Sequence, residues 1–152
     1  MKSPSKYAAA LAAVFTFGLL AGCADQGDGM AATTSPELAG AWYQVYFDTN
    51  SVEINARGRD IVERVAYVTA NNAATSVTVI GRTDRVGEPP ANLALSHRRA
   101  DAVRDALIGA GVPADRIETS WTGESKQAVA TANQVDEPRN RVVDITVVKT
   151  TP

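Results

Sequence analysis

The stretch from Gly81 to Ala100 reads G-R-T-D-R-V-G-E-P-P-A-N-L-A-L-S-H-R-R-A. A short apolar run at 76–80, S-V-T-V-I, precedes it and is typical of a buried strand, and the helical pattern that follows continues to about Ala110. Asp84 therefore lies where a strand gives way to a loop, and Arg99 lies on the next helix. The end of a strand that faces the start of a helix is a common ligand site. An acid and a base held apart there could bind the ammonium and the carboxylate of a zwitterion.

The segments on either side of this stretch predict the order β-α-β-α-β-β. The predicted strands are 42–47, 75–81, 116–121 and 142–148. The predicted helices run from the N-cap Asn55 to about Ala70, and from Pro89-Pro90 to Gly109 or Gly111. The segment 123–140 has no clear period and contains Pro138, so it is either a loop or a loop with one helical turn. This order predicts an α+β domain in which both helices pack on one face of a mixed four-stranded sheet.

Apolar periodicity indicates which side chains face the core. One face of the first helix carries Ile61, Val65 and Val68. A stripe along the second helix consists of Leu93, Ala100, Val103 and Leu107. Arg99 lies beside this stripe, so we expect it at the edge of the core, half sheltered and able to point back towards Asp84. Arg98 is rotated away and is expected in solvent. In the last strand Val143, Ile145 and Val147 are expected to face the core, with Val142 on the opposite side.

Residues 1–22 are expected to form a signal peptide. Lys2 and Lys6 supply its positive start, and the apolar run Ala8–Leu20 is too short to be read with confidence as a membrane span. The following L-A-G-C, which ends at Cys23, resembles the lipobox of bacterial lipoproteins. That resemblance implies that Cys23 becomes the lipidated first residue of the mature chain. A plain secretory signal with an incidental cysteine is the alternative.

Residues 23–40 are expected to form the lipidated cysteine and a flexible tether. The segment is rich in Ala, Gly, Thr, Ser and Asp and shows no sustained periodicity. By resemblance to lipoprotein sorting in enterobacteria, an acid directly after the cysteine would favour the inner membrane. Ala24 stands there and the acid comes one place later, at Asp25, which indicates the periplasmic face of the outer membrane.

Composition argues against several other functions. Loss of residues 1–22 removes two lysines and no acids, which takes the formal net charge from −2 to −4. A mildly acidic chain without a basic tract is expected to bind nucleic acid poorly, because neutralisation of phosphates supplies most of that affinity. The chain has one Cys and one His, so no zinc site can be drawn and no other cofactor is implied. His97 adjoins Ser96 in one helix, where neighbouring side chains diverge, so the two cannot form a nucleophile–base pair. We therefore expect no enzyme, and an ordinary surface role for His97.

Several ordered motifs resemble one known family. The motifs are F-D-T-N-S at 47–51, T-D-x-x-G at 83–87, Asn92, L-S-x-x-R-A at 95–100, G-E at 123–124 and N-R-V-V-D-I at 140–145. Together they resemble the OmpA C-terminal-like domain, the peptidoglycan-associating module of bacterial envelopes. The resemblance covers most of 42–148, which places the domain at 41–150 and implies the sandwich of helices and sheet described above.

The resemblance also implies roles for particular residues. Asp84 matches the acid that receives the ammonium of diaminopimelate in the peptidoglycan stem peptide, and Arg99 matches the base that holds a carboxylate. Further positions that match the same pocket are Thr83, Gly87, Asn92 and Arg141. Without the resemblance, Asp84 would be taken as a turn residue and Arg99 as a surface or ion-pair residue. A direct Asp84–Arg99 salt bridge would leave no ligand role.

The sequence departs from the family pattern in one motif. Where the family has two successive arginines after the Asn, this chain has Arg141 followed by Val142, so one possible outward-pointing cation is absent. The resemblance implies a lipid-anchored protein that binds peptidoglycan without covalent chemistry and tethers the membrane to the wall. The main alternative is a periplasmic lipoprotein that uses the same domain to bind protein partners in envelope assembly. Arg82 stands where the peptidoglycan-associated lipoprotein branch often has His, which leaves membership of the Tol system open.

Overall fold

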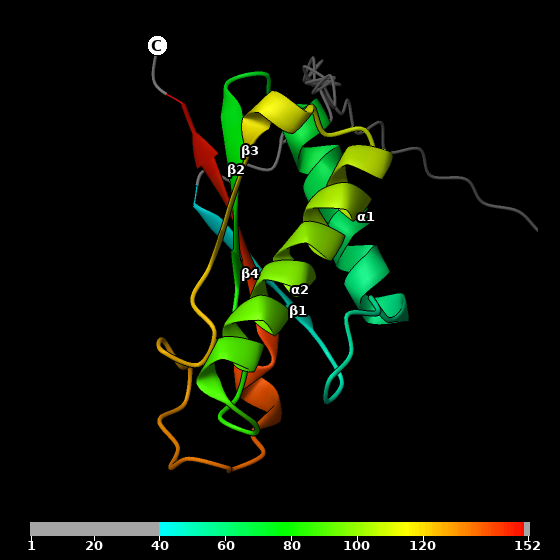
Figure 1. Cartoon of the computed structure of the whole chain (residues 1–152). Helices are drawn as coiled ribbons and strands as arrows, with labels where there is room; N and C mark the ends of the chain where they lie inside the picture. The colour runs from blue at the N-terminus through cyan, green and yellow to red at the C-terminus, as the bar shows by residue number, and fades with distance from the viewer. Residues whose placement is uncertain (1–39, 151–152) are drawn as a thin grey trace, which may run out of the picture. The chain divides into compact units, whose positions relative to one another are not determined.

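The computed structural model describes residues 40–150 (Figure 1). Its strands are β1 (Ala41–Tyr46), β2 (Thr75–Gly81), β3 (Ile117–Trp121) and β4 (Val142–Lys149). Its helices are α1 (Ala56–Ala70) and α2 (Pro89–Gly109), with short 3-10 turns at η1 (Ala114–Arg116) and η2 (Pro138–Asn140). The predicted order is confirmed. The long segment before β4 is a loop that ends in one helical turn, η2.

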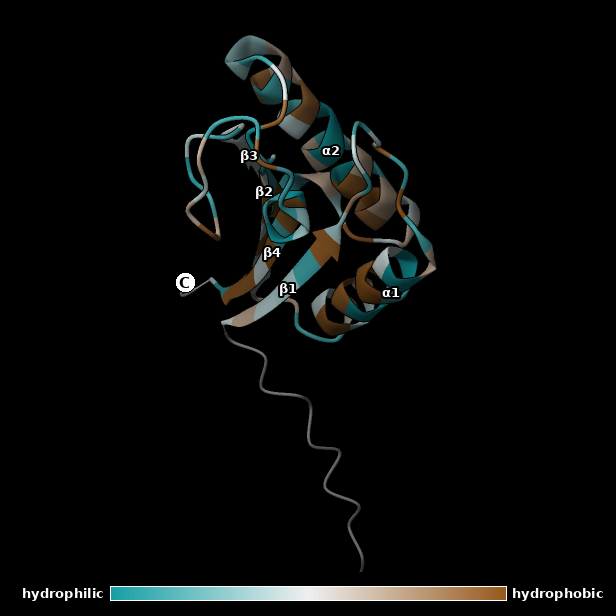
Figure 2. Ribbon diagram, turned by 90° about the horizontal axis from the view of Figure 1, so that it is seen from below, coloured by the Kyte–Doolittle hydropathy of each residue, from teal (hydrophilic) through white to brown (hydrophobic). Residues whose placement is uncertain are grey.

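The four strands form one mixed sheet in the order β1-β4-β2-β3. β4 pairs antiparallel with both β1 and β2, whereas β2 and β3 are parallel and are joined through α2. Both helices lie on the same side of this sheet, as the views from the side and from below show (Figures 1 and 2). The predicted fold class is therefore confirmed.

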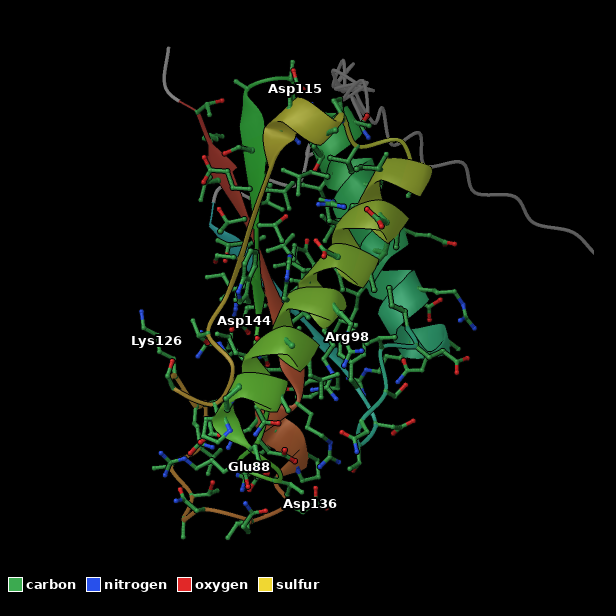
Figure 3. All side chains as sticks on the ribbon, in the orientation of Figure 1. Glu88, Arg98, Asp115, Lys126, Asp136 and Asp144 are labelled. Carbon is green, nitrogen blue, oxygen red and sulfur yellow. The ribbon has the colours of Figure 1, made fainter. Side chains whose placement is uncertain are left out.

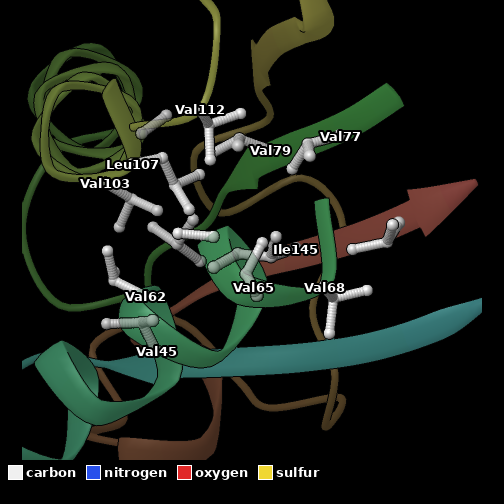
Figure 4. Close-up of a cluster of buried hydrophobic side chains, with 14 of the residues drawn as sticks. Val45, Val62, Val65, Val68, Val77, Val79, Val103, Leu107, Val112 and Ile145 are labelled. Carbon is white, nitrogen blue, oxygen red and sulfur yellow. The ribbon is translucent and has the colours of Figure 1, made fainter. Parts of the chain in front are cut away.

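The core lies between the helices and the sheet and consists mainly of valine (Figure 4). Alternate residues of the central strands point into it, which suits β-branched side chains because they pack well on a pleated surface. The sheet supplies Val45, Val77, Val79, Val143, Ile145 and Val147. The helices supply Val62, Val65, Ala66, Val68, Ala100, Val103 and Leu107. Residues 40–150 belong to one compact unit with this core of its own, so we expect the domain to fold without the preceding segment.

Two expected positions were wrong. Leu93 is 47% exposed, and Leu95 is buried in its place, because the first turn of α2 presents its backbone, not this side chain, to the rest of the domain. Ile61 is only partly buried, and the neighbouring Val62 occupies the core. Val142 lies on the sheet face opposite Val143 and Ile145, as expected, but it is fully buried and does not face solvent.

Two local features fix where the helices begin and how closely they approach the sheet. Asn55 caps α1 as predicted, since its side-chain oxygen accepts from the backbone N–H of Gly58 at 2.9 Å. Gly81, the last residue of β2, lies against the backbone of α2. A Cβ at this position would stand 2.0 Å from the carbonyl oxygen of Ser96. The end of β2 therefore reaches the helix directly, and the loop that follows begins against α2.

The predicted signal peptide, Cys23 and all of the predicted tether except its last residue lie outside the described residues. Within residues 40–150, neither helix is long and apolar enough to cross a membrane.

Candidate functional site

Asp84 and Arg141 form a buried ion pair at the end of β2. Nη1 of Arg141 donates to Oδ2 of Asp84 at 3.0 Å. Only 10% of the Arg141 side chain and 7% of the Asp84 side chain are exposed. Arg141 Nε also donates to the carbonyl of Phe47 at 3.2 Å. The structure thus brings together two residues that the sequence placed 57 positions apart. The acid has its partner in Arg141, so the expected alternative of a direct Asp84–Arg99 bridge is wrong.

Arg99 lies deeper than the sequence indicated, because its side chain is fully buried and not half sheltered. Its Nε donates to the carbonyl of Ser51 and its Nη2 to that of Asp48, both at 2.8 Å. A longer contact of 3.4 Å joins Nη1 to the carbonyl of Arg82. The guanidinium carbon also stands 5.2 Å from the centre of the Phe47 ring. The F-D-T-N-S segment therefore wraps around Arg99 through backbone carbonyls.

Burial of the guanidinium lowers the pKa of Arg99 to about 10. The negative charge of Asp84 opposes this decrease, and the positive charge of Arg141 adds to it. Arg99 is still a cation at neutral pH. The site therefore contains one buried carboxylate, that of Asp84, near two guanidinium groups. The guanidinium of Arg99 is fully buried, and that of Arg141 lies nearer the surface.

The remaining predicted residues surround this group and fasten it to the long loop. Thr83 is buried and its backbone N–H donates to the carbonyl of Gly123 at 3.0 Å. Asn92, on the first turn of α2, is buried and donates to Oε2 of Glu124 at 2.7 Å. Gly87 has φ +94°, a conformation that favours glycine. All the predicted site residues except Cys23, which is not described, therefore lie in this one region.

Sequence reasoning missed two residues of the long loop. The side-chain amide of Gln134 forms two hydrogen bonds with the backbone of Gly87. Its Oε1 accepts from the N–H of Gly87 and its Nε2 donates to the carbonyl of Gly87, each at 3.0 Å. Asp136 accepts a hydrogen bond from Arg141 through Oδ1 and lies at the lower end of the domain in Figure 3. The loop carries no periodicity and neither residue belongs to a quoted motif, so only their contacts reveal them.

Other polar side chains around this region already have partners. Ser96 donates its hydroxyl to the carbonyl of Leu93 at 2.7 Å and accepts from the N–H of Gly123 at 2.9 Å. His97 stacks on Trp121 with ring centres 3.7 Å apart and approaches Asp101 at 3.2 Å. Residues 40–150 contain no cluster of three or more His, Cys, Asp or Glu that could hold a metal ion. The arrangement suits recognition of a small zwitterion by charge and hydrogen bonds.

The hydroxyl of Thr83 gives a first prediction. It is buried and has no hydrogen-bond partner among the described residues. Such a group loses water without replacement, so Thr83→Val, which keeps the shape, is expected to leave stability unchanged or to raise it by about 1 kcal/mol. Urea unfolding followed by tryptophan fluorescence measures this change. A loss of stability above about 1 kcal/mol would mean that the hydroxyl has a stabilising partner in the folded protein.

A sequence profile described as the OmpA family matches residues 46–141. The chain belongs to the OmpA family. The match spans the whole site, from the strand before F-D-T-N-S to Arg141.

Several curated relatives share this domain. A peptidoglycan-associated lipoprotein of Haemophilus influenzae is 33% identical over 147 residues, which covers 90% of this chain and 95% of the relative. The probable lipoprotein YiaD of Escherichia coli is 37% identical over 103 residues, 68% of this chain. The chain spans 47% of YiaD and 29% of the outer membrane protein A of Yersinia pseudotuberculosis, so it corresponds to less than half of those two relatives.

Solved structures agree with the OmpA-family assignment. The peptidoglycan-associated lipoprotein of Burkholderia pseudomallei aligns with a TM-score of 0.64 at 28% identity, over 68% of this chain and 88% of that chain. The OmpA-like domain of FopA1 from Francisella tularensis aligns with a TM-score of 0.63 at 20% identity, over 79% of this chain and 88% of that chain, a similarity of fold alone.

Proposed function

We propose that this chain is a lipid-anchored, non-catalytic protein of the outer membrane. On this proposal its periplasmic domain binds the diaminopimelate residue of the peptidoglycan stem peptide and thereby tethers the membrane to the cell wall. The observation that carries the proposal is the buried Asp84 beside the guanidinium groups of Arg141 and Arg99. The alignment with the peptidoglycan-associated lipoprotein of H. influenzae over 90% of this chain supports it.

The side chain of diaminopimelate ends in an ammonium and a carboxylate on one carbon atom. Asp84 offers a carboxylate to the ammonium, and the two guanidinium groups offer positive charge to the carboxylate. Asn92, Thr83 and Gly87 shape the surroundings, and Asn92 holds Glu124 of the long loop at 2.7 Å. One acid and two bases in a sheltered place thus complement a zwitterion, where a purely cationic or anionic ligand would leave one group without a partner.

Single-site binding of this kind is expected to be weak, since it rests on a few hydrogen bonds to charged groups. Attachment at both ends compensates for this weakness. A lipidated Cys23 would anchor the chain, because each buried methylene contributes roughly 0.8 kcal/mol. The wall repeats the same peptide many times, so a domain that dissociates meets another peptide at high effective concentration.

The test compares two buried acids of equal exposure. Asp84 and Asp144 are both 5% exposed and both paired with arginine, but Asp144 bonds to Arg82 and Gln44 on the sheet face opposite the helices. We expect Asp84→Asn in the fragment 24–152 to weaken binding to purified sacculi about 10- to 100-fold, the value of one lost charge-assisted hydrogen bond. Asp144→Asn should bind as the wild type does. Co-sedimentation over a range of sacculus concentrations measures both.

Equal binding by the wild type and the Asp84→Asn variant would move the contact with the wall away from this site. Absence of binding by all three proteins would favour the second candidate, a lipoprotein that binds a protein partner in the periplasm. One feature favours that candidate: an open groove of about 570 Å³ runs between α1 and α2, and its wall includes Tyr67 with 64% of its surface exposed.

A further inference from the structure

Arg141 bridges two carboxylates that differ greatly in their exposure. On its inner side it binds Asp84, of which 7% of the side chain is exposed. On its outer side it binds Asp136, of which 62% of the side chain is exposed. Both contacts are made through the same nitrogen, Nη1. The outer position is therefore one at which a carboxylate from the surface side meets the guanidinium.

Arg99 is less suited to meet a carboxylate first. Its side chain is fully buried, and its Nε, Nη1 and Nη2 already donate to backbone carbonyls of Ser51, Arg82 and Asp48. These contacts use three of the five N–H donors of Arg99. Because the side chain is fully buried, a ligand carboxylate would reach the other two only after the surrounding residues had moved. Arg99 thus shapes the F-D-T-N-S segment and adds positive charge from behind, whereas Arg141 stands at the rim.

We infer that Asp136 occupies the place at which Arg141 receives the carboxylate of a zwitterionic ligand side chain, so that the chain's own acid competes with the ligand. This inference rests on the proposed function and names the competing group at the same site. A bound carboxylate would take over the hydrogen bond from Arg141, and Asp136 would turn out to solvent. The proton count does not change, because one carboxylate replaces another on the same guanidinium.

The loop around Asp136 allows this exchange without opening. Gln134 is fastened to Gly87 by its two amide hydrogen bonds, and its backbone N–H donates to the carbonyl of Arg85 at 2.8 Å. Glu137 on the other side is held by Arg139 through two contacts of 2.8 Å, and these hydrogen bonds lower its pKa to about 2. Asp136 lies between two fixed neighbours, and rotation about its own side-chain bonds is enough to withdraw the carboxylate.

Glu137 is not a second competitor. Both of its carboxylate oxygens accept from Arg139, so it is committed elsewhere. Among the described residues, Asp84 and Asp136 are the acids joined to Arg141 by a salt bridge. The inner one is needed for the ligand's ammonium, which leaves Asp136 as the acid whose removal should help binding.

The experiment measures affinity for a soluble tripeptide, L-alanyl-γ-D-glutamyl-meso-diaminopimelate, by isothermal titration calorimetry with fragment 24–152. If Asp136 occupies Arg141 about nine-tenths of the time, its removal raises the apparent affinity about tenfold. We therefore expect Asp136→Asn and Asp136→Ala to bind the peptide about tenfold more tightly than the wild type. The same peptide with its side-chain carboxylate converted to an amide should show no such gain.

Asp105→Asn is the matched control. Asp105 is an aspartate with 66% of its side chain exposed, it is paired with Arg104 at 2.8 Å, and it lies in the second half of α2. It changes the net charge by the same amount as Asp136→Asn, so a general electrostatic effect would appear in both variants. We expect its affinity to equal that of the wild type.

The outcomes separate the inference from the function on which it rests. Wild-type binding with no gain in either Asp136 variant would overturn the competition and leave the stem-peptide function standing. Binding by the Asp136 variants alone would support both and show that the wild-type site is strongly self-occupied. Absence of binding by every protein would reject the stem peptide as ligand, and the competition with it. An equal gain with the amidated peptide would overturn the assignment of the carboxylate to Arg141.

Discussion

Arg99→Leu is expected to destabilise the domain by about 3 kcal/mol. The guanidinium is fully buried and donates to the carbonyls of Asp48 and Ser51 at 2.8 Å. Leucine would leave these acceptors without their partner, and a buried polar group without a hydrogen bond costs about 1–3 kcal/mol. Relief from burying a charge offsets part of this loss. Urea unfolding followed by the fluorescence of Trp42 and Trp121 measures the change.

Arg98→Leu is the natural control for this experiment. Arg98 is the preceding residue of α2, is exposed to solvent as predicted, and is labelled in Figure 3. An exposed substitution of this kind is expected to change stability by less than about 0.5 kcal/mol. If the two variants were equally stable, the carbonyl contacts of Arg99 would not be holding the F-D-T-N-S segment in place.

The Arg99→Leu variant is expected to lose sacculus binding for a structural reason. A loss of sacculus binding by Arg99→Leu does not identify Arg99 as a ligand contact, because the segment that surrounds it would be displaced. Asp84→Asn and the Asp136 variants are more informative, since each changes one charge beside Arg141 while the buried carbonyl contacts of Arg99 are kept.

Gly81→Ala is expected to cost about 3 kcal/mol, towards the upper end of the usual penalty for overpacking. The added methyl would stand 2.0 Å from the carbonyl oxygen of Ser96 and 3.2 Å from Cβ of Ala100. The first of these atoms belongs to the backbone of α2, so the whole helix has to move. Displacement of α2 would also shift Asn92 and Arg99, so the variant should lose ligand binding together with stability.

Gly109→Ala, at the end of α2, supplies the opposite case. A Cβ at Gly109 would meet no heavy atom within 4 Å. Alanine favours the helix over glycine, so we expect a gain of about 0.5–1 kcal/mol in the free energy of unfolding. Urea unfolding of the two variants side by side tests the argument. Similar stability of both would show that the contact between β2 and α2 relaxes without cost.

Local patterns in the sequence were sufficient to predict the elements and the fold class. Alternation of valine in the strands and the cap at Asn55 are properties of neighbouring residues, and they determined the bounds to within one or two positions. The apolar periodicity of α2 wrongly placed Leu93 in the core, because this part of the helix packs against Gly123. A Cβ on Gly123 would approach the backbone of Leu93 to 3.1 Å, and the leucine side chain is left exposed.

The sequence predicted which residues form the site, but not which of them form hydrogen bonds and ion pairs with one another. The motifs identified Asp84, Arg99 and Arg141, yet which base pairs with the acid depends on chain segments 57 residues apart. The depth of Arg99 depends on two carbonyls, and carbonyls carry no signature in the sequence. Asp136 was missed for a related reason: it lies in a loop without periodicity, and only the fold brings it to Arg141.

The strand order β1-β4-β2-β3 pairs the first strand of the domain with its last. β1 is made first among the described strands, but within residues 40–150 the strand beside it is β4, the last of the four. A ribosome or a translocation channel that releases the chain from its N-terminus holds back the one partner that β1 can have. The parallel pair of β2 and β3 can form earlier, across α2. We therefore expect closure of the sheet by β4 to be the last step, so that the domain stays incomplete until this strand has emerged.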